Sequence, residues 1–267
     1  MDTKPLPAAL STKALSIGYS KKPLFSNIQL SFDKGELIGI FGINGSGKST
    51  LLKTLSKEIP PVRGQVFIQG KDSVSFSAKE FAKELSVVLT HPSFSENLTV
   101  KELVSLGRFP HNNWLGILSD KDKSNINDAL SQMHISALSH RKCAELSDGQ
   151  LQKVFIARAL AQNTDIILLD EPTNHLDLHF KFQVFNLLKQ VASQQKKVIL
   201  LATHELNMAM QICDKIILLH DGKILNDTPE ELIRGKHLEK LFPSDRVKFK
   251  EEAKIFQFQF KDFKDSK

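Results

Sequence analysis

Gly42-Ile-Asn-Gly-Ser-Gly-Lys-Ser49 is the stretch that decides the fold of this chain. It matches the pattern G-x-x-x-x-G-K-[ST], in which a glycine-rich loop turns its backbone N–H groups toward phosphate oxygens. The apolar run 36–41 precedes it, and leucines at helical spacing follow over 49–56. Strand, loop and helix in this order predict a nucleotide site.

Each residue type in this loop has a use in binding ATP and Mg²⁺. Lys48 can reach the β- and γ-phosphates, and the hydroxyl of Ser49 can bind Mg²⁺. The remaining residues supply backbone N–H groups and the positive end of the helix dipole. We expect the nucleotide to contact Gly42, Ile43, Asn44, Gly45, Ser46, Gly47, Lys48, Ser49 and Thr50.

A second motif, the acidic pair Asp170 and Glu171, directly follows a run of four apolar residues. A carboxylate at the end of a buried strand can hold Mg²⁺ through its water shell, which is the role expected of Asp170. Glu171 can orient or deprotonate the attacking water as a general base. Alone, two acids after a strand are ordinary, but the phosphate loop upstream favours the catalytic interpretation.

The remaining pattern predicts an α/β fold with a mostly helical insertion. Residues 13–19 and 28–32 alternate as half-buried strands do, and 65–69 is another strand. Helical spacing dominates from about 77 to 160, at 79–83, 100–107, 123–133 and 149–160. Three apolar strands follow at 166–169, 198–202 and 216–219, separated by helical stretches as in parallel βαβ units.

Composition is that of a globular protein, with 41% hydrophobic and 25% charged residues in 267. No apolar run reaches the ~20 residues of a membrane span, and the N-terminus lacks a secretory core, so we expect a cytoplasmic protein. Cys143 and Cys213 lie in no metal-binding spacing and are expected to be free thiols.

The net charge of +6 comes partly from the end of the chain. Ten Lys or Arg oppose six Asp or Glu over 234–267, and no DNA- or RNA-reading motif accompanies them, so we expect no nucleic-acid partner. We predict a basic extension over 245–267. Within it, Phe256, Phe258 and Phe260 alternate with glutamines, which predicts a short edge strand that closes the domain; a surface for another protein is the alternative.

Leu146-Ser-Asp-Gly-Gln150 lies between the phosphate loop and the acidic strand end, directly before the helical stretch 149–160. Ser147 and Gly149 can donate a hydroxyl and a backbone N–H to a phosphate at a helix N-terminus. As an isolated string this is weak, because Ser-Asp-Gly turns often cap helices. As the middle of an ordered series of three motifs it is specific.

In this order the three motifs resemble those of ABC transporter ATP-binding subunits, over residues 14 to about 242. The resemblance implies a P-loop NTPase (RecA-like) core over 1–244, with a helical subdomain at about 77–160 and an antiparallel β part near the N-terminus. It also implies a homodimer that sandwiches two ATP molecules. Each nucleotide would then meet the second copy's signature, formed by Ser147, Asp148, Gly149 and Gln150.

The resemblance assigns three further positions. Tyr19 matches the aromatic residue that stacks on adenine, although a tyrosine before a loop is often only packing. Asp177 ends the segment Thr173-Asn-His-Leu-Asp177, which resembles the loop that links the two sites of the dimer. His204 occupies the place of the histidine that contacts the γ-phosphate.

Three residues depart from the family pattern. Asp148 replaces the middle glycine of the signature, and Glu205 replaces the common aspartate. Thr90 stands where the family has a glutamine that touches Mg²⁺ and senses the permease. A threonine hydroxyl is shorter than an amide and could reach the metal through a water, so the expected metal site is Ser49, Asp170 and Thr90, without the glutamine's coupling role.

Three segments resemble the importer ATPases for iron–siderophores, haem and cobalamin: 107–111, 159–162 and 204–207. This implies a peripheral subunit on the cytoplasmic face of the inner membrane that hydrolyses ATP to energise uptake of a metal chelate. Permease subunits would dock on 97–118, and an extracytoplasmic binding protein would act through them. Alternatives are an importer subunit for another substrate, a soluble ABC protein of translation or DNA repair, and a P-loop kinase; a kinase leaves 146–150 and His204 without a role.

Overall fold

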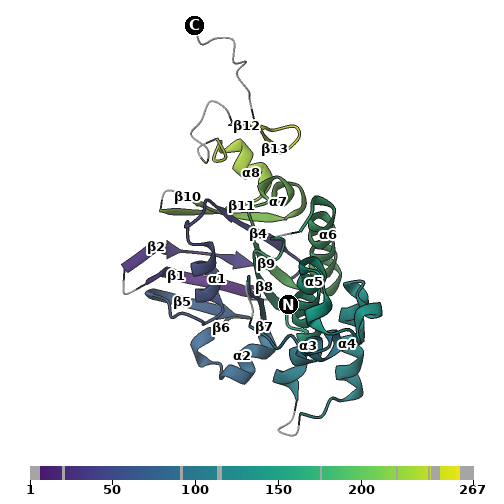
Figure 1. Cartoon of the computed structure of the whole chain (residues 1–267). Helices are drawn as coiled ribbons and strands as arrows, with labels where there is room; N and C mark the ends of the chain where they lie inside the picture. Colours follow the sequence, from purple (N-terminus) through teal and green to yellow (C-terminus); the bar gives the residue numbers. More distant parts are fainter. Residues whose placement is uncertain are drawn as a thin grey trace, which may run out of the picture.

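The computed structural model describes residues 7–19, 22–90, 93–112, 116–174, 176–220, 222–239, 241 and 247–258. Its centre is a six-stranded sheet, parallel except for β11 (Figure 1). The strands in spatial order are β11 (Lys223–Asp227), β10 (Lys215–His220), β4 (Leu37–Gly42), β9 (Val198–Ala202), β8 (Ile166–Asp170) and β7 (Leu85–Val88). The predicted parallel strands are thereby confirmed.

The inner strands of this sheet are buried on both faces, which explains their continuous apolar sequences. Neighbouring residues belong to different hydrophobic clusters: Leu37 belongs to the cluster of Leu103 and Leu188, and Ile38 to that of Leu10 and Ile17 near the N-terminus. Polar residues at the strand ends, such as Asp170, are therefore held by a rigid, two-sided core.

The second sheet is antiparallel and lies near the N-terminus of the chain. Its strands are β1 (Leu10–Tyr19), β2 (Lys22–Ile28), β3 (Ser31–Phe32), β5 (Arg63–Ile68) and β6 (Lys71–Asp72). The expected single strand over 28–32 is wrong, because the chain bends between β2 and β3. There the Thr12 hydroxyl donates to Ile28 O at 3.0 Å and accepts from Leu30 N at 2.9 Å, beside the backbone bond from Thr12 N to Leu30 O at 2.9 Å.

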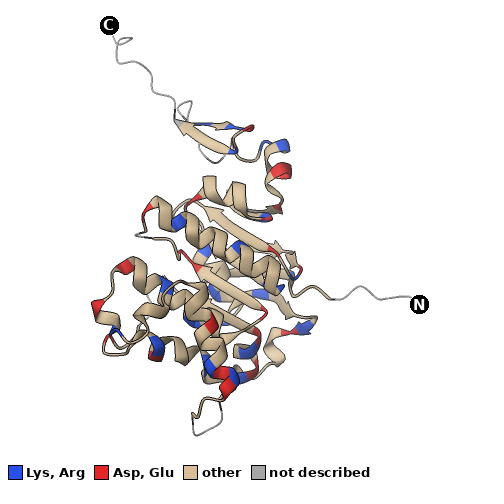
Figure 2. Ribbon diagram, turned by 90° about the vertical axis from the view of Figure 1, so that its right-hand side faces the viewer, with Lys and Arg blue, Asp and Glu red and all other residues tan. Residues whose placement is uncertain are grey.

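Helix α1 (Lys48–Leu55) follows the phosphate loop and contacts both sheets, with Leu51 and Leu55 completely buried. Three other helices cover the large sheet or its end: α6 (Leu178–Gln195), α7 (Leu206–Ile212) and α8 (Pro229–Arg234). Figure 2 shows Lys and Arg residues interspersed with Asp and Glu residues over much of the ribbon. No helix in the described part of the chain is long and apolar enough to cross a membrane.

The predicted helices between 77 and 160 are confirmed and lie together at one end of the large sheet (Figure 1). They are α2 (Ala78–Glu84), α3 (Val100–Ser105), α4 (Asp120–Gln132) and α5 (Asp148–Gln162), with 3₁₀ turns at η1 (Ser73–Ser75), η2 (Leu106–His111), η3 (Ser136–Leu138) and η4 (Cys143–Glu145). Each of the four α-helices begins at a reciprocal capping box, which satisfies two backbone donors at its start.

One buried ion pair joins these helices. Arg108 Nε of η2 donates to Asp122 Oδ1 of α4 at 2.8 Å, and its Nη1 donates to the carbonyls of Ala161 and Gln162 at the end of α5. Arg108 is 4% exposed and Asp122 6%. Removing either partner would leave a buried charge without its counterpart.

The C-terminal extension forms a hairpin of β12 (Val247–Lys250) and β13 (Ile255–Phe258), which pair with each other in a separate sheet. The predicted strand is present at 255–258, but it does not extend either large sheet. Instead Phe249 and Phe256, with ring centroids 5.0 Å apart, pack against the core, and Phe256 N donates to Asn207 Oδ1 of α7 at 2.9 Å. Phe260 lies outside the described residues.

Both cysteines are free and buried, as expected: Cys143 is 2% exposed and Cys213 6%. Burial raises the pKa of both thiols, that of Cys213 to about 12. Thiolate is the reactive form of cysteine, so neither side chain is poised for chemistry at neutral pH.

Candidate nucleotide site

The phosphate loop has a backbone that only glycine fits at two positions. Gly47, the residue before α1, has φ +103°, and a Cβ there would lie 2.5 Å from Leu24 Cδ2. At Gly42 a Cβ would lie 2.3 Å from Ser46 Oγ, so the loop closes back on the end of β4. The loop therefore passes close to β2 and to the sheet while its N–H groups remain at the start of α1.

Lys48 stretches back across this loop. Its Nζ donates to Gly42 O at 3.0 Å and lies 3.8 Å from Glu171 Oε1. The side chain is 5% exposed, and burial lowers the pKa of the ammonium against the opposing effect of the two neighbouring carboxylates. A buried cation beside open backbone donors is suited to bind phosphate oxygens.

Ser49 and Asp170 meet at the ends of α1 and β8. Ser49 Oγ donates to Asp170 Oδ1 at 3.2 Å, and Asp170 is 8% exposed. Burial, followed by the charge of Glu171, raises the pKa of the Asp170 carboxyl despite the hydrogen bond from Ser49. A hydroxyl and a buried carboxylate that needs a compensating cation are oxygen ligands of the kind that Mg²⁺ prefers, so these residues fit that ion.

Thr90, two residues after β7, donates from Oγ1 to the backbone carbonyl of Asp170 at 3.0 Å. The hydroxyl proton therefore ties the ends of β7 and β8 together, and only its lone pairs remain for a water or a metal. His91 and Pro92 lie outside the described residues. The assignment of Thr90 to the metal site stays a prediction.

Glu171 is held from both sides at the end of β8. His204 Nε2 lies 2.5 Å from Glu171 Oε1, and Asn174 Nδ2 donates to Glu171 Oε2 at 2.6 Å. The backbone of Glu171 has φ +51°, which is uncommon for a residue with a side chain, and its N–H donates to Ala202 O at 3.0 Å. The tight turn from Glu171 to Asn174 therefore aims the carboxylate toward Lys48 and His204.

A cleft of 590 Å³ brings these groups together. Tyr19, with 58% of its surface exposed, lines the cleft, and so do Glu171 and His204 together with the loop. The lining residues are Tyr19, Leu24, Asn44, Gly45, Ser46, Gly47, Lys48, Ser49, Thr50, Glu171 and His204. All except Leu24 were expected from the sequence.

Two residues of the cleft region escaped prediction. Leu24 reaches Gly47 from β2, a contact that depends on the pairing of β1 with β2. Asn174 reaches Glu171 through a turn in which Asn174 N also donates to Glu171 O at 3.2 Å. The signal available for Asn174 was its position three residues after Glu171, the spacing at which a turn returns a side chain to its own start.

The signature residues do not line this cleft. Ser147 caps α5: its Oγ accepts from Gln150 N at 3.4 Å, and Gln150 Oε1 accepts from Ser147 N at 3.2 Å. Ser147 and Asp148 are exposed, and a Cβ on Gly149 would lie 3.2 Å from Leu176 Cδ2. The signature thus lies against the loop before α6, at a surface separate from the phosphate loop of its own chain.

Asp177 and Glu205 have structural partners. Asp177 Oδ1 accepts from Phe180 N at 2.9 Å as the N-cap of α6. Glu205 Oε1 lies 2.5 Å from Lys181 Nζ, which joins α6 to the start of α7. His175, between the acidic strand end and Asp177, is not among the described residues.

Comparison with known proteins agrees with this arrangement. The family model described as "ABC transporter" matches residues 25–174. The achromobactin transport ATP-binding protein of Dickeya dadantii is 38% identical, over 80% of this chain and 79% of its own. The iron(3+)-hydroxamate import ATP-binding protein of Bacillus subtilis is 37% identical, over 89% of this chain and 88% of its own.

A solved structure shows the same fold over almost the whole chain. A putative metal-chelate type ABC transporter, captured in an inward-facing conformation, superposes with a TM-score of 0.78 at 27% identity, covering 94% of this chain and 97% of the other. The matched segment contains both the phosphate loop and the acidic strand end. The chain therefore belongs to the ABC transporter family, as one of its ATP-binding ATPases.

Proposed function

We propose that this chain binds and hydrolyses ATP as the paired, cytoplasmic-side subunit of an importer for a ferric or other metal chelate. The observation that carries the ATPase assignment is the cleft in which Lys48, Ser49, Glu171 and His204 converge. The cargo class is supported by the relatives of the chain, among them the iron(3+)-hydroxamate import ATP-binding protein of Bacillus subtilis. An importer subunit for another substrate is the alternative.

Within the cleft, the loop N–H groups and Lys48 would bind the phosphates, and Tyr19 would stack on adenine. Mg²⁺ would be held by Ser49 and Asp170, with Thr90 acting through a water, and would neutralise phosphate charge. Glu171 would accept the proton of the attacking water, and Asn174 would keep that carboxylate in place. His204 would contact the γ-phosphate from the side of Glu171.

A homodimer completes the proposed site. Ser147 and Asp148 are exposed, and none of residues 147–150 lines the cleft of its own chain. The N-terminus of α5 presents the positive end of the helix dipole and the N–H groups of Asp148 and Gly149, which the capping box does not use and which suit an anion supplied by a second copy. Each phosphate loop would face the partner's Ser147, Asp148, Gly149 and Gln150, and Asp177 would lie where the two copies meet.

The permease would dock on the surface around η2, at the membrane's cytoplasmic face. Three large apolar residues in this stretch are exposed, Leu106 by 50%, Phe109 by 75% and Ile117 by 64%. Exposed apolar groups clustered in one segment are typical of a protein contact. A cargo-loaded extracytoplasmic binding protein would act only through the permease, and no nucleic acid is a partner in this proposal.

Glu171→Gln tests the catalytic assignment. The variant should bind ATP with unchanged affinity and hydrolyse it at least about 100-fold more slowly, the size expected for loss of a general base. Phosphate release and ATP binding are measured on the same samples. Glu251→Gln, an exposed change in the turn of the C-terminal hairpin, is the matched control.

Near-normal turnover of Glu171→Gln would overturn the assignment of Glu171. Affinity purification from membranes addresses the transport assignment separately. Recovery of a permease supports it, whereas recovery of ribosomes or DNA without a permease contradicts it and favours a non-transport ABC protein.

A further inference from the structure

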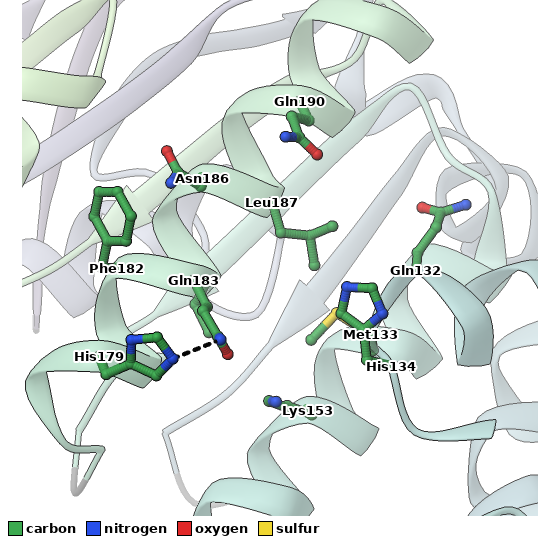
Figure 3. A pocket seen from close by; sticks show the side chains of 11 residues that line it. Gln132, Met133, His134, Lys153, His179, Phe182, Gln183, Asn186, Leu187 and Gln190 are labelled. Carbon is green, nitrogen blue, oxygen red and sulfur yellow. Dashed lines mark hydrogen bonds between the residues drawn. The ribbon is translucent and has the colours of Figure 1, made fainter. Parts of the chain in front are cut away.

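A second pocket, of 380 Å³, lies between the end of α4, the middle of α5 and one side of α6 (Figure 3). It shares no lining residue with the nucleotide cleft. Its volume is within the range of roughly 300–1,000 Å³ typical of small-molecule sites. No residue of the phosphate loop, of the acidic strand end or of the signature lines this pocket.

Among the residues that line the pocket, Lys153 carries the formal charge at neutral pH. Lys153, His134 and His179 line the pocket, and no Asp or Glu is among the lining residues. Helix α6, which supplies most of one wall, carries no acidic residue over its eighteen positions. Figure 3 shows His179 and Gln183 on one side, joined at 2.9 Å, and His134 on the other.

Lys153 is the central cation. Its Nζ lies 4.5 Å from the centroid of the Phe180 ring, so a cation–π contact holds the ammonium between α5 and α6. The side chain is half-buried, and burial lowers the pKa of the ammonium. Among the described residues the structure gives it no carboxylate partner, so an anion would meet a positioned and partly desolvated cation.

The floor of the pocket is apolar. Met133 is 3% exposed and Val184 2%, and Leu187 lies on the side of the pocket that Met133 faces in Figure 3. The ring of Phe182, 50% exposed, lies at the rim. Amide side chains, including Gln183 and Asn186, supply hydrogen-bonding groups around this floor. The ligand that suits the pocket therefore has an anionic end and a flat apolar body.

We propose that this pocket binds a small organic anion with an aromatic or alicyclic body, its carboxylate facing Lys153 and its ring lying on Met133 and Leu187. Such a ligand contacts two helices, α5 and α6, which begin at different sequence motifs. Helix α5 begins at Asp148 in the signature, and α6 begins directly after Asp177. Occupancy of the pocket fixes these helices relative to each other and so acts on the face that carries the signature.

Calorimetric titration with 2-naphthoate tests the proposal, with 2-naphthamide as the uncharged compound of the same shape. Saturating ADP keeps the nucleotide cleft occupied. We expect 1:1 binding of naphthoate at least about tenfold tighter than naphthamide, a difference of about 1.4 kcal/mol. Lys153→Gln and His179→Gln should each reduce this preference, and Lys121→Gln, an exposed charge removal on α4, should leave it unchanged.

Three results would overturn the proposal: no binding at millimolar naphthoate, equal binding of the two compounds, or an unchanged preference in both pocket variants. Urea unfolding of each variant shows whether it is folded, and His179→Gln, at an exposed position, serves where Lys153→Gln is unstable. The measurement requires no ATP hydrolysis, so its outcome is independent of the role proposed for Glu171.

Discussion

Asn174 donates a 2.6 Å hydrogen bond to the carboxylate that faces Lys48 and His204. Without this donor, Glu171 could rotate about its side chain toward solvent, since the imidazole would hold only one of its two oxygens. A hydrogen bond to a charged group contributes about 1.5–3 kcal/mol. Asn174 is therefore a positioning residue for the proposed base.

Replacing Asn174 by Ala should lower kcat for ATP hydrolysis about tenfold or more, because the carboxylate loses one of its two supports. KM for ATP should change little, since Asn174 does not line the cleft. Asn174→Asp should be worse than Asn174→Ala, because it places a second acid against Glu171. Steady-state kinetics of both variants check this, and a rise in KM with unchanged kcat would contradict the positioning role.

At the residue scale, the positions of the cleft residues were largely predictable, because motif spacing and strand ends determine where Lys48, Ser49 and Glu171 lie. Contacts that arise from turns and strand pairing were not, as for Asn174 and Leu24. The sequence predicts that the Thr90 hydroxyl lies near Asp170. It does not predict that this hydroxyl donates to the backbone carbonyl of Asp170. The acceptor depends on the register between β7 and β8, which no pattern of residues specifies.

The buried pair of Arg108 and Asp122 joins η2, α4 and the end of α5. Burial alone would raise the pKa of the Asp122 carboxyl, but hydrogen bonds from Ser119 and Arg108 outweigh it and lower the pKa from 3.8 to about 2. The folded state thus binds a proton less tightly than the unfolded chain. The stabilisation is present above about pH 4 and is lost as pH falls toward 2.

Asp122→Asn should lower the free energy of unfolding by about 3 kcal/mol at pH 7, because it leaves Arg108 buried without its counter-charge. It should also flatten the loss of stability between pH 4 and 2. Urea unfolding at several pH values measures both effects. Asp120→Asn, on the same helix but with a side chain 99% exposed, is the control and should change stability by less than about 0.5 kcal/mol.

At the element scale, helices and parallel strands were predictable wherever periodicity and caps agreed, as in α5 with its capping box and in the buried run of β8. The break between β2 and β3 was not, because it depends on a single side chain, Thr12, whose hydroxyl bonds to the backbone of Ile28 and Leu30 between the two strands. The pairing of β13 was also unpredictable: alternating phenylalanines indicate a strand but not its neighbour, here β12.

In the proposed homodimer, each copy supplies two half-sites on separate surfaces: the phosphate-loop cleft and the exposed start of α5. Two copies related by a twofold axis would bring each half-site to its complement. Activity then requires one intact half-site from each copy. A copy that is defective in one half-site can still supply the other half-site to its partner.

Lys48→Ala and Ser147→Arg should each abolish hydrolysis when tested alone, and an equimolar mixture should recover a substantial part of it. In a mixed dimer, the phosphate loop of the Ser147→Arg copy meets an intact signature from the Lys48→Ala copy, so one of two sites is complete. Phosphate release from mixtures at several ratios measures the recovery. Mixtures as inactive as the separate variants, at concentrations where wild type is active, would contradict a shared site.

The burial of both thiols has a practical consequence for such experiments. With Cys143 and Cys213 both closed off and their pKa values raised, the folded wild-type chain should react slowly with maleimides. The wild-type chain is therefore a suitable background for introducing single reactive cysteines at chosen positions. Lys22 and Ala144 are exposed and lie outside the cleft and the signature, Ala144 three residues before Ser147. Cysteines at these two positions could carry a pair of spin or fluorescent labels, and the distance between the labels would report assembly of the two copies during each round of hydrolysis.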